Sequence, residues 1–348
     1  MKTMKKFILL VLVLLLLLPG CSLGEETVTV YCVSKITAKN ADGSEEVFRE
    51  FEYDKHGNLL DIKLSETPRT FTYDSRGNVL SCSFYTSNGA PGRKYLYTYD
   101  SKDNLIRFQS VDPAGSQQYA YVYTYDQDGN RISLHEYDED NILESYYQVA
   151  YDEFGNRTQF VQYDQEGQET CRVIMTYDSE NRLLKSEWSY GSYLYYTYDE
   201  KGNLLYEDGS GGTRPYRAVF TCDSQGNLLE QNKKFADGDS ERKVCTYDER
   251  GNLLTSKTTR STTQKETYYE WTYDKKGNLL TASLSDDAWL EYSYISFKAP
   301  ASHAEKIKAA QARFMWALDN GSIRLGLIHP WYFANTYEDI AESNAFSY

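Results

Sequence analysis

The sequence predicts an all-β protein, an antiparallel meander of hairpins coiled into a curled sheet or a solenoid-like ribbon and ended by a short α-helical cap. Three observations predict this fold. A degenerate Tyr-Asp-x-x-Gly-Asn motif returns ten times, with its first position at 53, 73, 99, 125, 151, 177, 198, 222, 247 and 273. Apolar and polar residues alternate around each copy, and a helical pattern follows only after the last one. Repeats of this period indicate units that pack on their neighbours.

The first segment, residues 1–20, is predicted to be a bacterial lipoprotein signal peptide. A basic start precedes an apolar run from Phe7 to Leu18, which is too short to span a membrane. Leu18-Pro19-Gly20-Cys21 is similar to a lipobox, so Cys21 is the expected site of lipid attachment. The alternative is a plain signal peptide with an incidental cysteine. Residues 21–45 then hold the lipidated Cys21, a short tether and a first strand, and the lipid would hold the protein on the bacterial membrane or envelope, outside the cytoplasm.

Residues 46–295 contain the repeats, and each motif is predicted to form a tight turn. In the copy at 126–130, Asp126 suits the first position of a type I turn, and Gly129 suits the left-handed residue that follows it. Where glycine is missing, its position holds Asp103 or Asn181, the residue types that enter left-handed conformations most readily after glycine. The glycines predicted to define turns are Gly57, Gly77, Gly129, Gly155, Gly202, Gly226, Gly251 and Gly277.

Strands are predicted on both sides of each turn. Tyr121, Tyr123 and Tyr125 alternate with polar or smaller residues, as in a half-buried strand. A second turn signal between successive motifs gives two strands and two turns per repeat, roughly twenty strands in all. Because a twisted open sheet rarely exceeds about ten strands without curling, we expect the tyrosine and leucine ladders to face the inside. Water, threonine ladders or acidic turn residues are expected to satisfy the tyrosine hydroxyls.

These hairpins resemble the Rhs or YD-repeat family, whose unit is a similar Tyr-Asp-x-x-Gly-Asn/Arg-Leu hairpin. The resemblance covers about residues 46–295. It implies a long coiled β-sheet, which in very large members closes into a hollow shell around a toxin, and shorter YD repeats have been associated with carbohydrate binding. The copies here are too few for a large shell, and the sequence shows no recognisable toxin-like domain after them.

Residues 296–348 are predicted to form a C-terminal helix and a capping segment. Ser302 and Glu305 suit a capping box at the start of the helix. One helical face would carry Ile307, Ala310, Phe314 and Leu318, with Gly321 at the end. Because a repeat array needs its last hydrophobic edge covered, this helix and Trp331–Phe333 are predicted to cap the open end of the sheet. A docking site for a partner is the alternative.

Composition and motifs argue against nucleic-acid binding and catalysis. A net charge of −14 disfavours nucleic acid as a partner. The sequence lacks a Gly-x-Ser-x-Gly elbow, a phosphate loop, a His-Glu-x-x-His and a Cys-x-x-Cys, so no catalytic residue and no cofactor is expected. Asp126, Asp128 and Asn130 offer three oxygen side chains, but a distal bidentate Glu is missing, which favours a plain turn and no metal site.

The expected function is therefore binding or scaffolding by a lipid-anchored, non-enzymatic protein of the bacterial cell surface. Its expected partners are the membrane, through the lipid, and a glycan or a surface protein. Tyrosines could stack on sugar rings, although core packing explains their alternation at least as well. Two alternatives stay open: a toxin-related or secreted-cargo role, which rests on the family resemblance alone, and a glycan-cleaving enzyme with two carboxylates roughly 5 to 9 Å apart.

Overall fold

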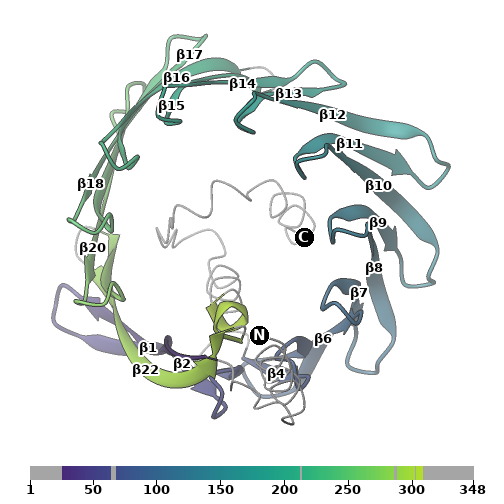
Figure 1. Cartoon of the computed structure of the whole chain (residues 1–348). Coiled ribbons are helices and arrows are strands. Elements are labelled where there is room, and N and C mark those ends of the chain that lie inside the picture. Colours follow the sequence, from purple (N-terminus) through teal and green to yellow (C-terminus); the bar gives the residue numbers. More distant parts are fainter. Residues whose placement is uncertain (1–25, 64–67, 212–213, 286–287, 302, 309–348) are drawn as a thin grey trace, which may run out of the picture.

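The computed structural model describes residues 26–63, 68–211, 214–285, 288–301 and 303–308. These residues form one sheet of 22 strands, in which each strand is hydrogen-bonded antiparallel to the next along the chain (Figure 1). The strands are β1 (Thr27–Asn40), β2 (Glu45–Tyr53), β3 (Leu59–Lys63), β4 (Arg69–Tyr73), β5 (Val79–Tyr85), β6 (Pro91–Tyr99), β7 (Leu105–Val111), β8 (Gln117–Tyr125), β9 (Arg131–Tyr137), β10 (Leu143–Tyr151), β11 (Arg157–Asp164), β12 (Glu169–Tyr177), β13 (Leu183–Trp188), β14 (Tyr193–Tyr198), β15 (Leu204–Gly211), β16 (Arg214–Cys222), β17 (Leu228–Phe235), β18 (Ser240–Tyr247), β19 (Leu253–Arg260), β20 (Glu266–Tyr273), β21 (Leu279–Ser285) and β22 (Ala288–Pro300).

The sheet is a closed barrel, so the prediction of an open curled sheet or solenoid-like ribbon is wrong. Strand β1 pairs antiparallel with β22 from Thr27 opposite Pro300 to Asn40 opposite Ala288. An open sheet would leave a row of unpaired backbone groups along each edge, and coiling through one full turn lets the two edges satisfy each other. The sheet does not remain an open ribbon, because its first and last strands meet.

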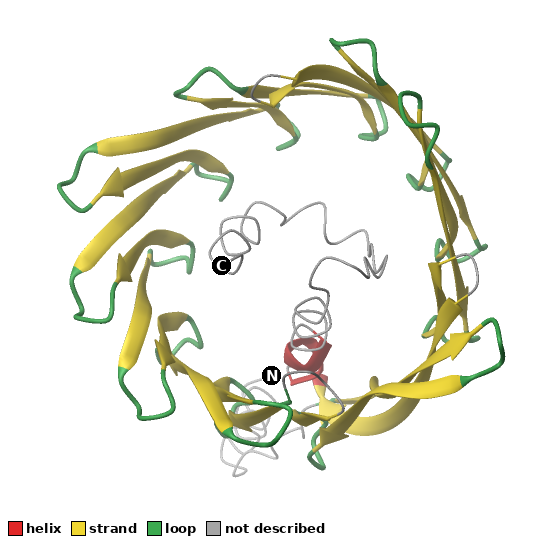
Figure 2. Cartoon of the chain, turned by 180° about the vertical axis from the view of Figure 1, so that it is seen from behind, coloured by secondary structure: helices red, strands yellow, loops and turns green. Residues whose placement is uncertain are grey.

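Closure also removes the reason given for a helical cap. The edges of β1 and β22 are hydrogen-bonded to each other, so neither is an open edge for a helix to cover. Strand β22 continues to Pro300, and the helix that follows is described at Ala301 and at 303–308. Figure 2 shows this helix, in red, inside the ring of strands. The predicted helical positions Ala310, Phe314 and Leu318, and Trp331–Phe333, lie outside the described residues, as does Cys21.

All the Tyr-Asp turns lie at one end of the barrel, because each joins an even-numbered strand to the next odd-numbered one. In the 126–130 turn, the Gly129 amide donates to the Asp126 carbonyl at 3.3 Å, and the Asp126 amide donates to the Asn130 carbonyl at 3.0 Å. The eight glycines singled out above have φ between 80° and 90°. Asp103 and Asn181, which stand in place of glycine, have φ of 69° and 60°. The turns therefore use the left-handed conformation that the motif predicts.

The motif tyrosines lie on the face of the sheet that carries the helix, the inner face, and the backbone satisfies their hydroxyls. Tyr73 donates to the carbonyl of Leu59 at 2.7 Å and Tyr125 to that of Leu105 at 2.8 Å. Each acceptor is the first strand residue after the Tyr-Asp turn of the previous repeat. The same bond recurs from Tyr151, Tyr177, Tyr198 and Tyr294. These backbone acceptors were not among those expected from the sequence. Acidic acceptors serve other tyrosines, such as Tyr121 with Glu136.

The outer face is polar. A threonine precedes most of the motif tyrosines and points outward, and four of these threonines bond to a hydroxyl across the hairpin, as in Thr124 with Ser133 at 2.7 Å. Ion pairs also lie on this face, among them Lys63 with Glu52. The largest apolar cluster is on the inner face, where strands from the two ends of the chain meet, and it includes Ile36, Ile62 and Leu290. Among the described residues, no helix is long and apolar enough to cross a membrane.

Candidate functional site

A second set of tyrosines points outward and is exposed. Tyr195 is 38% exposed and Tyr206 is 41% exposed. Tyr195 alternates with the inward Tyr196 and Tyr198 along β14, and Tyr206 is paired with the outward Thr197. Packing of the barrel interior therefore does not account for these two side chains. They are the most informative surface residues for function.

Strand pairing brings these tyrosines together with four charged residues. Tyr195 lies between Lys185 on β13 and Asp208 on β15, and Asp208 in turn lies opposite Arg217 on β16. Tyr206 lies between Thr197 on β14 and Val219 on β16. We call this surface the outer tyrosine patch; its members are Lys185, Glu187, Tyr193, Tyr195, Tyr206, Asp208, Arg217 and Val219.

Hydrogen bonds and ion pairs order the patch. Tyr195 donates its hydroxyl to Glu187 at 2.9 Å, and Lys185 binds the same carboxylate oxygen at 2.7 Å. The rings of Tyr193 and Tyr195 stack, with centroids 4.6 Å apart. These bonds from Lys185 and Tyr195 lower the pKa of Glu187, and the bond to Glu187 raises the pKa of Tyr195. At neutral pH Glu187 is therefore a carboxylate and Tyr195 a phenol.

The second half of the patch is a bidentate ion pair beside Tyr206. Arg217 donates from Nε and Nη2 to the two oxygens of Asp208, at 2.6 and 2.8 Å. The Arg217 guanidinium carbon is 5.9 Å from the centre of the Tyr206 ring. The two acids and two bases of the patch give it no net charge. It presents aromatic carbon, hydrogen-bond donors and hydrogen-bond acceptors within one rigid stretch of sheet.

Tyr206 departs from the repeat. The third residue of the strand after each Tyr-Asp turn faces outward, opposite the residue that precedes the motif tyrosine. In five other copies it is a charged residue or a glutamine, at Asp61, Arg107, Gln159, Lys185 and Glu230. In the remaining four copies it is a serine or threonine that bonds to an outward threonine across the hairpin. These pairs are Thr72 with Ser81, Thr124 with Ser133, Thr246 with Thr255 and Thr272 with Thr281. Tyr206 occupies the same position opposite Thr197. The hairpin therefore does not require a tyrosine here, and comparing this position across the ten copies is the sequence signal that would have found it.

The candidate calcium loop at 126–130 is used by the turn itself. One oxygen of Asp126 accepts the amides of Asp128 and Asn130 at 3.0 and 2.8 Å, and the other accepts the Asn130 side chain at 2.9 Å. In the part of the chain that the structure describes, no three metal-ligating side chains gather at one place. Asp126 therefore acts as a turn residue.

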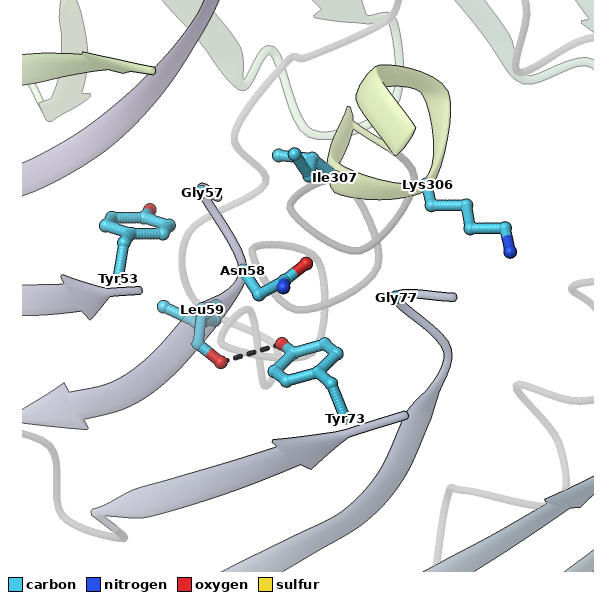
Figure 3. Close-up of a pocket in the computed structure, with 8 residues that line it drawn as sticks. All are labelled: Tyr53, Gly57, Asn58, Leu59, Tyr73, Gly77, Lys306 and Ile307. Atoms are coloured by element: carbon cyan, nitrogen blue, oxygen red, sulfur yellow. Dashed lines mark hydrogen bonds between the residues drawn. The ribbon is translucent and has the colours of Figure 1, made fainter. Parts of the chain in front are cut away.

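Figure 3 shows a small pocket at the Tyr-Asp end, where the C-terminal helix meets two turns. Its lining residues are Tyr53, Gly57, Asn58, Leu59, Tyr73, Gly77, Lys306 and Ile307. The hydrogen bond from Tyr73 to the Leu59 carbonyl joins two of these lining residues. The helix side chains Ile307 and Lys306 come from far along the chain, so this is a contact between the barrel and the segment that follows it.

No protein-family model and no curated protein sequence matches this chain. The solved structures that match include TcdB2-TccC3, at 13% identity and a TM-score of 0.29, with 72% of this chain and 19% of that one covered. A Photorhabdus luminescens Tc holotoxin pore matches at the same identity and TM-score, over 70% of this chain and 18% of that one. A porin-like protein from Bacteroides uniformis has 11% identity and a TM-score of 0.30, with 76% and 96% covered. The chain thus spans about a fifth of the length of the toxin-complex chains, and none of these likenesses is high enough to carry an argument about function.

Proposed function

We propose that this protein is a lipid-anchored, non-enzymatic component of the bacterial cell surface that binds a glycan through the outer tyrosine patch. The observation that carries the proposal is the outward, exposed Tyr206, an aromatic residue in a position that the nine other copies fill with hydroxyl, charged or amide side chains. A residue that leaves the repeat pattern without entering the core is best explained by a contact outside the chain.

The chemistry of the patch suits a saccharide. Tyrosine rings offer flat apolar faces for the C–H faces of a sugar ring, together with a hydroxyl. Asp208 and Glu187 offer acceptors, and Arg217 and Lys185 offer donors, for sugar hydroxyls. The absence of net charge favours a neutral saccharide over a strongly charged one. Because tyrosine has only two side-chain torsions and the sheet is rigid, little entropy would be lost on binding.

Anchoring through Cys21 fits the topology of the barrel. Strand β1 begins at the Tyr-Asp end, where Thr27 lies opposite Pro300. Thr27 lies six positions after Cys21, a reach of at most about 20 Å, so the lipid would keep the Tyr-Asp end near the membrane. The ion pairs of the outer face would be unfavourable in hydrocarbon, which supports attachment by the lipid and a barrel in water outside the cytoplasm.

The acids of the patch support binding without catalysis. Glycoside cleavage requires a carboxylic acid that stays protonated near neutral pH beside a second carboxylate. Glu187 is held ionised by Lys185 and Tyr195, and both oxygens of Asp208 accept hydrogen bonds from Arg217. Both acids therefore act as hydrogen-bond acceptors in the patch.

The test is binding of the soluble domain, residues 22–348, to a panel of bacterial and host glycans, with and without calcium. Tyr206→Thr creates the hydroxyl pair that four other repeats have, so the hairpin should keep its stability while affinity falls about tenfold, the loss expected from about 1.4 kcal/mol of aromatic contact. Tyr268→Thr is the matched control, because Tyr268 on β20 is a similarly exposed tyrosine, at 45%, and lies outside the patch. Absence of saturable binding, or equal losses in both variants, would refute the proposal.

A further inference from the structure

The C-terminal helix is seated against three consecutive Tyr-Asp turns, those at 54–58, 74–78 and 100–104. In Figure 1 the helix, in yellow-green, lies inside the ring near the strands of the N-terminal half. Its Ala304 and Ile307 are 1% and 3% exposed and pack in one cluster with Val30 and Cys32 of β1. Within the described part of the helix, Ala304 and Ile307 are the residues that join this apolar cluster.

Lys306 supplies the polar part of the contact. Its ammonium nitrogen lies 3.0 Å from the Arg76 carbonyl, 3.0 Å from Asn78 Oδ1 and 2.8 Å from Asp103 Oδ2. An ammonium has three protons to donate, so these three acceptors satisfy all of them. The acceptors belong to two neighbouring turns, and Lys306 therefore ties the helix to the turn row.

Asp103 is the residue that departs from the repeat in these turns. It stands where most copies have glycine, at a φ of 69°, a conformation that strains any residue with a Cβ atom. Its carboxylate binds Lys306 at 2.8 Å, Arg76 at 2.6 Å and the Asn78 side chain at 2.8 Å. Asn181, the other replacement in a motif turn, also bonds to the neighbouring turn, through Asn156 at 2.9 Å. Unlike Asn181, Asp103 carries a negative charge, and it therefore also binds Lys306.

The turns also leave room for the helix. A Cβ atom built on Gly77 would lie 1.9 Å from His303 Nε2, and one on Gly57 would lie 3.2 Å from Ile307 Cδ1. Gly129 and Gly155 have no atom within 4 Å of such a Cβ. All four glycines have positive φ, but only the first two are also required for space.

We propose that Asp103 and Lys306 form a latch that holds the C-terminal helix against the Tyr-Asp end of the barrel and releases it reversibly. Both side chains keep partial solvent exposure, 29% for Asp103 and 33% for Lys306, so dissolved salt can screen their attraction. His303 Nε2 is buried in the docked position with no hydrogen-bond partner among the described residues, which weakens docking. Salt screening and this unpaired nitrogen both favour release, which would uncover the turns at 54–58, 74–78 and 100–104. The latch is independent of the outer tyrosine patch.

The test is hydrogen exchange by mass spectrometry on residues 22–348, following the peptide that contains 303–308. Asp103→Gly restores the usual turn residue while removing the carboxylate that binds Lys306, so the helix amides should exchange about tenfold faster and strands β7 and β8 should not change. Asn181→Gly is the matched control, because it makes a similar change in a turn whose hydrogen bonds do not involve residues 303–308, and it should leave the helix unaffected. Raising the NaCl concentration from about 0.05 to 0.5 M should speed exchange in the wild type and have less effect in Asp103→Gly.

Two outcomes would overturn the latch. One is unchanged helix exchange in Asp103→Gly. The other is faster exchange spread equally over β7, β8 and the helix, since that would mean general destabilisation of the turn. Lys306→Met, which keeps the aliphatic stem but not the charge, should match Asp103→Gly, and the double variant should be no faster than either single one.

Discussion

Gly129→Val isolates the backbone requirement of the Tyr-Asp turn. Gly129 has φ of 90°, and a Cβ atom at this position would have no neighbour within 4 Å, so the substitution introduces no clash. The whole effect comes from forcing a β-branched residue into a left-handed conformation, which should lower the free energy of unfolding by about 1–3 kcal/mol. Urea unfolding followed by circular dichroism measures this loss. Gly251→Val, in a turn with φ of 82°, should behave in the same way.

Two companion variants separate strain from contact. Gly129→Asn should cost clearly less than Gly129→Val, because Asn141 and Asn181 already adopt φ of 60° in this barrel. Gly77→Ala should cost more than Gly129→Ala, since only the former places an atom against His303. A loss near zero for Gly129→Val, or equal effects of valine and asparagine, would refute the turn mechanism.

Three further predictions follow from the tyrosine and aspartate bonds. Tyr73→Phe removes the donor to the Leu59 carbonyl and should cost about 0.5–1.5 kcal/mol in urea unfolding, whereas Tyr268→Phe, which bonds to an exposed glutamate, should cost almost nothing. The bond from the Asn130 side chain lowers the pKa of Asp126. The ionised Asp126 therefore stabilises the fold above its unfolded pKa of about 3.9, and this contribution is lost as the pH falls through the lower folded value. Asp126→Asn should flatten the acid side of a plot of unfolding free energy against pH. Burial raises the pKa of Tyr273 to about 12. The neutral Tyr273 side chain therefore contributes its full stability to the fold below the unfolded pKa of about 10, and this contribution is lost as the pH rises through the folded value. In an absorbance titration of tyrosinate, Tyr273→Phe should remove one group that ionises late.

The local parts of the fold could be predicted from the sequence, because each depends on neighbouring residues. Gly129 and its sister glycines require left-handed turns, and the alternation of Tyr121, Tyr123 and Tyr125 gives a half-buried strand. Closure could not be predicted in this way. It depends on the twist summed over all the strands, and nothing in the pattern of Val28, Val30 and Cys32 indicates that β1 will meet β22.

The residues of the two candidate sites could also be predicted only in part from the sequence. Tyr206 lies outside the turn motif, and its difference from the other repeats shows only when the outward position is compared across all ten copies. Asp103 was recognised as a replacement for glycine, yet its partner Lys306 is 203 residues away in the sequence, and only the folded chain brings the two together. Local motif rules explain why Asp103 is tolerated, and the tertiary contact explains what its charge does.

Closure of the barrel is tested most directly by a disulfide between its first and last strands. Thr29 lies opposite Lys298 and accepts a hydrogen bond from it at 2.6 Å, so cysteines at these two positions are within reach of each other. Mild oxidation of Thr29→Cys/Lys298→Cys should join the two strands within one molecule, as seen by mass spectrometry of the digested protein. Thr29→Cys/Thr124→Cys, with the second cysteine on β8, should not cross-link. Failure of the first pair to form an intramolecular bond in a folded protein would contradict the closed barrel and restore the open ribbon.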